Sequence, residues 1–188
     1  MQVNHVRENG HIDLDWSLRQ YPEDFRCMPV QTQRAARLLD GAERPVIIAG
    51  NGVHASQSYD ELAAVAEAYE AIVVTSYLGK STYPETDPLA GGVIGSFGHE
   101  GANRVVSEAD TLLVVGCRMN PMDTNWLAPS FIRPDEQTII HADIDSSNAG
   151  WVYPADVGLI GDAAESLSAL LDGDGDNGWA HERAEAAK

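Results

Sequence analysis

The sequence contains almost no lysine. Lys80 and Lys188 are its only two lysines, and arginine supplies the remaining basic side chains of a 188-residue chain whose net charge is −17. Such an acidic surface repels nucleic acid and anionic membranes, so we expect neither as a partner. The sequence also lacks any apolar run approaching the roughly 20 residues that a membrane-spanning helix needs.

Cysteine is equally scarce. Cys27 and Cys117 lie far apart, which excludes a disulfide framework and any cysteine-based metal spacing. The six histidines are scattered, and none lies four residues from another, so no zinc site is predicted. Cys117 follows an apolar run and Gly116, which predicts a reduced thiol packed in the core.

The first ten residues are polar and lack the apolar middle of a secretory signal, so we expect a cytoplasmic protein. The acidic composition also suggests a halophilic host. Dense carboxylates repel one another, and molar salt, with a Debye length of about 3 Å, screens that repulsion. The alternative is an acidic protein with no requirement for salt.

Length and a hydrophobic content of 44% fit one domain with short tails. Residues 1–29 mix charges, prolines and aromatic side chains without periodicity, and we interpret them as an N-terminal arm or linker. Residues 30–171 carry the periodic segments and are predicted to form the domain. Residues 172–188 are rich in glycine, aspartate and asparagine, a composition typical of a linker.

Apolar runs and helical patterns alternate through the domain. Strands are predicted at residues 46–49, 71–75, 111–115, 138–144 and 157–160, and helices at 31–40, from Ser58 to Tyr69, at 103–108 and from Asp162. This alternation predicts an α/β fold, a Rossmann-like doubly wound and mostly parallel sheet with helices on both faces. Residues 76–101 form a long glycine-rich connection, which we expect to be functional, and residues 118–134 are predicted to be irregular.

A glycine turn follows the first strand, as Gly50-x-Gly52-x-x-Ala55. In dinucleotide-binding folds such glycines permit a tight turn and let the backbone approach a pyrophosphate. The alternative is that they only shape the turn. The second strand ends near Thr75 and Ser76 without the acidic residue that holds the ribose of NAD, so NAD binding is disfavoured.

Short motifs occur in a consistent order between residues 30 and 171. They are Arg44-Pro-Val-Ile-Ile-Ala-Gly-Asn-Gly-Val; Gly79-Lys80; Pro84-Glu85; Pro88-Leu89; Gly95 and Gly98 with Ala102-Asn103; Ala109-Asp110; Gly116 with Arg118; Ile140-His-Ala-Asp-Ile-Asp145; Tyr153-Pro154; and Gly161-Asp162-Ala163. Together they resemble the central domain of thiamine-diphosphate-dependent enzymes, the superfamily of acetolactate synthase and benzoylformate decarboxylase.

In that superfamily a pyrimidine-binding domain precedes the central domain and a diphosphate-binding domain follows it. The flanking domains supply the catalytic glutamate and a Gly-Asp-Gly motif that holds thiamine diphosphate through magnesium. The resemblance implies that this chain is a non-catalytic piece of a 2-oxo-acid decarboxylase or synthase, whose parent is a homodimer or homotetramer. Gly173-Asp-Gly175 copies the start of the metal motif, but it lies in the polar tail and is predicted to be linker.

Some members of the superfamily bind FAD or ADP in the central domain, and others bind no nucleotide there. The resemblance would place a nucleotide against Gly50, Asn51, Gly52, Thr75, Ser76, Gly79, Gly98, Gly116, Arg118, Asp143, Ile144, Asp145, Gly161 and Asp162. Acetolactate synthases usually carry Arg-Phe-Asp-Asp-Arg where this chain has Arg118-Met-Asn-Pro-Met-Asp123, which weighs against FAD. We expect no catalytic residue and no metal ligand in this chain.

Two other functions fit the same residues, a stand-alone Rossmann-like oxidoreductase and a nucleotide-sensing module. Asp143 and Asp145 would point to opposite faces if their strand continued, so nucleotide contact or helix capping is favoured over catalysis. One interpretation of Trp126, Trp151 and Tyr153 is an aromatic platform for a base, but packing between the irregular segment and the sheet, or against a neighbouring domain, is favoured. His54 and His99 are interpreted as surface residues. The candidate site residues are therefore assigned to binding alone.

Overall fold

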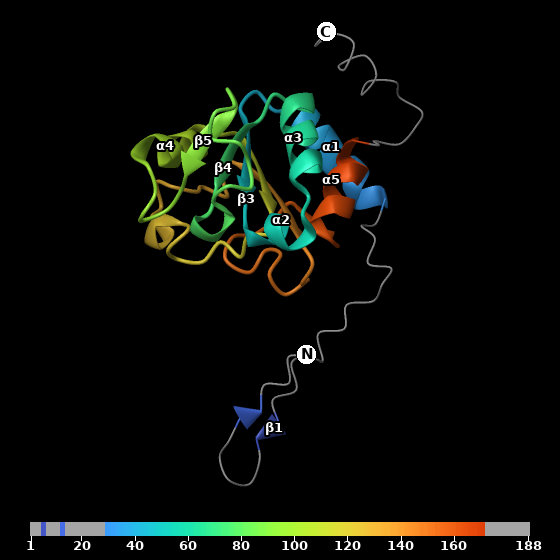
Figure 1. The fold of residues 1–188 in the computed structure, drawn as a ribbon, viewed down its shortest axis with the longest axis vertical. Coiled ribbons are helices and arrows are strands. Elements are labelled where there is room, and N and C mark those ends of the chain that lie inside the picture. The colour runs from blue at the N-terminus through green and yellow to red at the C-terminus, as the bar shows by residue number, and fades with distance from the viewer. Residues whose placement is uncertain (1–4, 7–11, 14–28, 172–188) are drawn as a thin grey trace.

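A computed structural model describes residues 5–6, 12–13 and 29–171. His5–Val6 (β1) and Ile12–Asp13 (β2) form a small antiparallel pair. All other described residues belong to a sheet with helices on both of its sides (Figure 1). The predicted C-terminal linker at 172–188, most of the predicted arm at 1–29, and Cys27 lie outside the described residues.

The described domain alternates strands and helices along the chain. Its strands are Pro45–Ala49 (β3), Ile72–Thr75 (β4), Ala90–Val93 (β5), Thr111–Val115 (β6), Thr138–Asp143 (β7) and Val157–Ile160 (β8). Its helices are Pro29–Asp40 (α1), Asn51–Ser56 (α2), Tyr59–Ala68 (α3), Glu100–Glu108 (α4) and Ala163–Leu171 (α5), with 3₁₀ turns at Tyr77–Gly79 (η2) and Asn125–Leu127 (η3). In the described part, no helix combines the length and the apolar character needed to cross a bilayer.

The six strands are all parallel and lie in the order β5-β4-β3-β6-β7-β8. The chain starts at the centre with β3, moves outward to β4 and β5, and then returns to the other side of β3 as β6. The predicted doubly wound α/β fold is thus confirmed. The direction of winding reverses between β3 and β6, and the carboxyl ends of strands at such a reversal are where these sheets bind ligands.

Strand β3 shows how both faces of the sheet are buried. Ile47 and Ala49 point into a core shared with α1, α3 and α5, whereas Val46 and Ile48 point into a second core formed with α4 and residues 117–132. Successive side chains of a strand alternate between faces, so a strand covered on both sides must be apolar throughout. Burying each large aliphatic side chain contributes about 1.5–3 kcal/mol.

Strand β5 lies in the connection at 76–101 that was predicted to be a loop. Ala90-Gly-Gly-Val carries two glycines and has low intrinsic preference for a strand. The neighbouring strand explains the first glycine, because a Cβ on Gly91 would lie 2.7 Å from Val74 Cγ1 and 2.8 Å from Ile72 Cγ2. Packing against β4 therefore requires a residue without a side chain at position 91, and the local sequence pattern alone does not predict a strand there.

Several helix starts differ from the predictions or refine them, and α1 already begins at Pro29, the last residue of the predicted arm. Helix α2 begins at Asn51, directly after Gly50, and α4 begins at Glu100, ahead of the predicted residue 103. Ser58 precedes α3 as predicted. Ser58 and Glu61 have the spacing of a capping box, but the Ser58 hydroxyl lies 2.7 Å from Ser56 Oγ and makes no bond to the helix backbone, so the spacing does not produce that cap. Asp162 does cap α5, where its Oδ1 accepts the Ala164 N–H at 2.9 Å.

Candidate functional site

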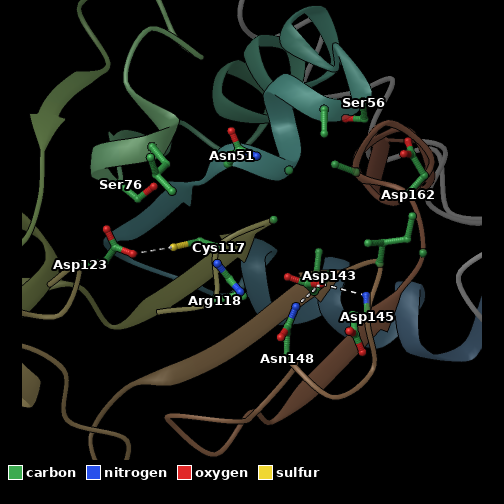
Figure 2. Close-up of a pocket in the computed structure, with 18 of the residues that line it drawn as sticks. Asn51, Ser56, Ser76, Cys117, Arg118, Asp123, Asp143, Asp145, Asn148 and Asp162 are labelled. Carbon is green, nitrogen blue, oxygen red and sulfur yellow. Dashed lines mark hydrogen bonds between the residues drawn. The ribbon is translucent and has the colours of Figure 1, made fainter. Parts of the chain in front are cut away.

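A cleft of about 620 Å³ opens at the carboxyl ends of β3, β6 and β7, close to the start of α5 (Figure 2). It lies where the winding direction reverses, as the fold requires for a ligand site. Its volume falls within the roughly 300–1,000 Å³ of small-molecule sites. The cleft is therefore the candidate functional site of the described domain.

Ten of the fourteen residues predicted to bind a nucleotide line this cleft. They are Asn51, Gly52, Ser76, Gly116, Arg118, Asp143, Ile144, Asp145, Gly161 and Asp162. The fold thus brings together residues from five separate segments of the sequence. Their contact with a ligand stays a prediction.

The other four predicted residues, Gly50, Thr75, Gly79 and Gly98, do not line the cleft. Thr75 is buried beside a smaller cavity at the β5 edge. A Cβ on Gly50 would lie 2.3 Å from the carbonyl oxygen of Gly116, and one on Gly79 would lie 2.2 Å from that of Ala49. These glycines are therefore explained by backbone packing around the strand ends.

The glycine turn at the start of α2 also packs against backbone. The N–H of Gly52 donates to the carbonyl of Gly116 over 2.9 Å, and a Cβ on Gly52 would lie 2.5 Å from Gly116 Cα. Gly116 has φ +56°, a left-handed conformation that favours glycine. The backbone of Gly52 thus approaches Gly116 closely, instead of leaving that space for a pyrophosphate. The Gly52 N–H already donates its hydrogen bond to the Gly116 carbonyl.

Three carboxylates lie on one side of the cleft, from Asp143, Asp145 and Asp162 (Figure 2). Asp143 Oδ1 accepts the N–H of Asp145 at 2.9 Å and the side-chain amide of Asn148 at 3.0 Å. Strand β7 ends at Asp143, so strand alternation does not extend to Asp145. The condition under which these two carboxylates would point to opposite faces is therefore not met, and both line the same cleft.

Arg118 is the only cationic side chain among the described residues that line the cleft. Figure 2 shows Arg118 and Asn51 between the carboxylate side and an opposite side formed by Ser76 and Asp123. The Ser76 hydroxyl accepts the Gly79 N–H at 3.0 Å and so caps η2. One guanidinium therefore separates two chemically different ends of the cleft.

Asp123 and Cys117 form the buried floor near Ser76. Burial raises the pKa of Asp123, while the backbone N–H of Tyr77 and the charge of Arg118 act in the opposite direction. Burial, followed by the charge of Asp123, raises the pKa of the Cys117 thiol to about 12. Cys117 is buried and unpaired, which confirms the predicted packed thiol and leaves it protonated at neutral pH.

Several cleft residues were missed by sequence analysis, notably Ser56, Asn120, Asp123 and Asn148. Asn120 forms hydrogen bonds within the turn after β6 through both its backbone carbonyl and its side-chain amide. Its Oδ1 accepts the Met122 N–H at 2.9 Å. Asparagine, aspartate and serine in the segment that follows a strand are typical of such turns. That pattern predicts a turn at Asn120 and Asn148, but it does not place either side chain in a cavity.

The two candidate histidines have different surroundings. His54 Nε2 lies 2.9 Å from the Lys80 carbonyl and its Nδ1 lies 3.0 Å from the Tyr59 hydroxyl, so its ring bridges α2 to η2 and α3. His99 is exposed at the start of α4, in agreement with the prediction of a surface residue. Across the residues described, no cluster of three histidine, cysteine or acidic side chains could hold a metal ion.

Residues 32–170 match the family described as thiamine pyrophosphate enzyme, central domain. The chain belongs to this family. The match covers the whole sheet and its helices from α1 to α5, and it confirms the resemblance found from the short motifs. The central domain of a thiamine pyrophosphate enzyme is thus the identity of the described fold.

The central domain is similar to segments of several known enzymes. It is 40% identical over 146 residues to a probable acetolactate synthase large subunit of Methanocaldococcus jannaschii, covering 76% of this chain and 24% of that relative. It is 38% identical over 142 residues to sulfoacetaldehyde acetyltransferase of Castellaniella defragrans, covering 74% of this chain and 24% of that relative. The chain therefore spans about a quarter of the length of these relatives.

Proposed function

We propose that this central domain scaffolds a thiamine-diphosphate-dependent 2-oxo-acid decarboxylase or synthase, without catalysing a step itself, and that its cleft binds the ADP portion of ADP or FAD. The family match and the similarity to acetolactate synthase large subunits support the first part. The second part rests on one observation. The cleft sets three carboxylates on one side of a single guanidinium, that of Arg118.

The carboxylate side suits a nucleoside. Ionised carboxylates accept hydrogen bonds from ribose hydroxyls and from the amino group of adenine. The Asp145 N–H and the Asn148 amide hold Asp143, while Asp145 Oδ1 accepts the N–H and hydroxyl of Ser147 at 2.9 and 2.6 Å. These bonds within one turn orient both acceptors before a ligand arrives.

The centre of the cleft suits the phosphates. A diphosphate close to Asp143, Asp145 and Asp162 would be repelled, whereas a guanidinium presents a planar set of donors that matches phosphate oxygens. Arg118 supplies that group, and Asn51 adds an amide on the facing helix α2. Because the Gly52 N–H is bonded to Gly116, we assign phosphate recognition to side chains more than to the glycine turn.

The parent enzyme would take thiamine diphosphate and magnesium, which supply the nucleophilic carbon for cleaving or joining 2-oxo acids. We assign both groups to the flanking pyrimidine- and diphosphate-binding domains. We further propose that the parent is a cytoplasmic homodimer or homotetramer. The described residues contribute the sheet that positions these domains and the cleft at its edge.

Thermal unfolding of the full chain with ADP, FAD and NAD tests the nucleotide proposal. ADP or FAD should raise the midpoint, because a ligand that binds only the folded state stabilises it. NAD should not. Arg118→Ala should abolish the response to ADP and keep a response to adenosine, whereas Asp145→Asn should weaken both.

Matched controls lie on α4, away from the cleft. Arg104→Ala and Glu108→Gln remove an exposed cation and an exposed carboxylate, and both should leave the ligand responses unchanged. Unaltered midpoints with millimolar ADP and FAD would reject nucleotide binding. Hydride transfer to or from NAD by the purified chain would instead favour a stand-alone oxidoreductase.

A further inference from the structure

In the described part of the chain, no tryptophan or tyrosine lines the cleft. Trp126 and Trp151 are 71% and 65% exposed, so packing against the sheet is wrong for both, and packing against a neighbouring domain stays a prediction. Tyr153 does pack against the core formed with α4 and residues 117–132, as favoured. An aromatic platform is therefore not part of the cleft, and Asn51 at the start of α2 is one of its polar side chains instead.

Gly52 follows Asn51, and an asparagine–glycine pair is the sequence in which spontaneous deamidation meets least hindrance, because glycine has no side chain. The backbone nitrogen of the glycine attacks Cγ of the asparagine and closes a five-membered succinimide. The side-chain nitrogen leaves as ammonia and takes the amide proton of the glycine with it. Water then opens the ring to aspartate or to isoaspartate, so the reaction needs no other reagent.

The pair occurs three times in the chain, as Asn9-Gly10, Asn51-Gly52 and Asn177-Gly178. Only the second lies within the described residues, and there the fold requires the glycine. A Cβ at position 52 would lie 2.5 Å from Gly116 Cα. Asn51 itself is exposed and lies in the middle of the cleft, near Arg118 (Figure 2). Close packing thus keeps a reactive pair at the centre of the candidate site.

The closed fold blocks the attacking nitrogen. The Gly52 N–H donates to the Gly116 carbonyl over 2.9 Å, so its proton is held and the nitrogen is directed toward Gly116. Attack requires that this nitrogen lose its proton and turn toward Cγ of Asn51. Deamidation therefore has to wait until the Gly52–Gly116 hydrogen bond opens.

Helix α2 is built to open locally. It has six residues, fewer than the roughly 12–15 that an isolated helix needs, and Val53 is its only buried residue. Gly50 at its N-cap supplies no side-chain hydrogen bond to the first turn. Segments with few buried contacts open at a lower free energy than the whole domain, so the first turn of α2 can open while the sheet stays folded.

We propose that Asn51 is a deamidation site of the native chain, that opening of the Gly52–Gly116 hydrogen bond sets its rate, and that the product weakens phosphate binding in the cleft. The last part rests on the proposed function. An aspartate at position 51 would compete with a phosphate for the guanidinium of Arg118. An isoaspartate would also add one carbon atom to the main chain and shift Gly52 away from Gly116.

Ageing of the full chain near pH 8 tests the site and its protection. Peptide mapping by mass spectrometry measures the conversion of amide to acid at each asparagine–glycine pair. In denaturant the three pairs should react at similar rates. In buffer Asn51 should react measurably, but at least about tenfold more slowly than in denaturant, because only the opened turn reacts.

Hydrogen exchange of the Gly52 amide measures the same opening independently. Its exchange also requires that the bond to Gly116 break, so its protection factor should match the slowing of deamidation at Asn51 within about a factor of three. Asn51→Gln is the control for the assignment. Its longer side chain would have to close a six-membered ring, so the conversion at this position should disappear.

The effect of the product is measured with Asn51→Asp, which should lose the rise of the unfolding midpoint with ADP. Asn125→Asp is the matched control, because Asn125 is exposed and does not line the cleft. It adds the same charge and should keep the ADP response. An ADP response that survives in Asn51→Asp would refute the weakening of phosphate binding.

Three results would overturn the deamidation site. They are equal rates at Asn51 in buffer and in denaturant, no conversion at Asn51 in buffer, or a slowing that differs from the protection of the Gly52 amide. If the unaltered chain shows no ADP response, the proposed nucleotide binding fails. The rates at Asn51 still decide the deamidation site in that case, so the two failures are distinguishable.

Discussion

The Nε2–H of His141 donates a hydrogen bond to the backbone carbonyl of Cys117 over 2.9 Å. A carbonyl can only accept, so the proton lies on Nε2, and Nδ1 faces the N–H of Gly150 at 3.4 Å. His141 is 3% exposed on β7, the strand next to the edge strand β8. This neutral ring ties β7 to the turn after β6 that carries Arg118, and thereby helps to shape the cleft.

Acid should weaken the fold through His141. Burial lowers the pKa of this histidine, and Asp143 and the Cys117 carbonyl offset part of that shift. Between the folded and the unfolded pKa the unfolded chain binds more protons, so the free energy of unfolding falls as pH drops below about 6.5. Urea unfolding of His141→Gln should show a flatter pH dependence than the parent chain.

His99→Gln is the control for this pH effect, because His99 is exposed. It should keep the pH dependence of the parent chain. If His141→Gln and His99→Gln give the same slope between about pH 7.5 and 5.5, another group dominates the acid response.

Gly52→Ala should destabilise the domain by about 1–3 kcal/mol, the usual cost of overpacking a close-packed site. The added Cβ would lie 2.5 Å from Gly116 Cα. The Gly116 atom is part of the backbone, so it cannot rotate away as a flexible side chain could. Gly101→Ala is the control, since a Cβ there meets nothing within 4 Å. Urea midpoints of the two variants measure the difference, and a neutral Gly52→Ala would contradict the close contact.

Cys117 should resist alkylation in the folded chain. The thiol is buried, and its pKa is raised to about 12, so almost no thiolate is available to react. In a Cys27→Ser background, iodoacetamide near pH 8 should label Cys117 at least a hundredfold faster in denaturant than in buffer. Equal rates in the two conditions would show that Cys117 is accessible in the native fold.

Molar potassium chloride should raise the unfolding midpoint, because screening relieves repulsion within a chain of net charge −17. Glu67 and Glu70 are exposed at the end of α3, whose last turn has no basic residue. A carboxylate there opposes the helix dipole, so Glu67→Gln should stabilise by about 0.3–1 kcal/mol at low salt and flatten the salt dependence. A midpoint that does not rise with salt would reject the halophilic interpretation.

Local patterns in the sequence predicted most of the sheet. Strands β3 and β6 are uninterrupted apolar runs, and such runs are characteristic of parallel strands buried on both faces. The alternation with helices then predicted the doubly wound fold, and the ordered motifs predicted the family. Ten residues of the cleft followed from these two inferences, because the carboxyl ends of parallel strands meet at one edge.

The sequence by itself determined the class of fold, the family and the acidic character of this central domain, since each depends on residue type and local spacing. Tertiary structure decided the rest. It made Gly91 part of a strand, gave Gly52 a backbone contact with Gly116, and brought Asp123 and Asn148 into the cleft. It also left Trp126 exposed on a strained turn. Each of these outcomes depends on how close two distant segments come, and no local pattern records that distance.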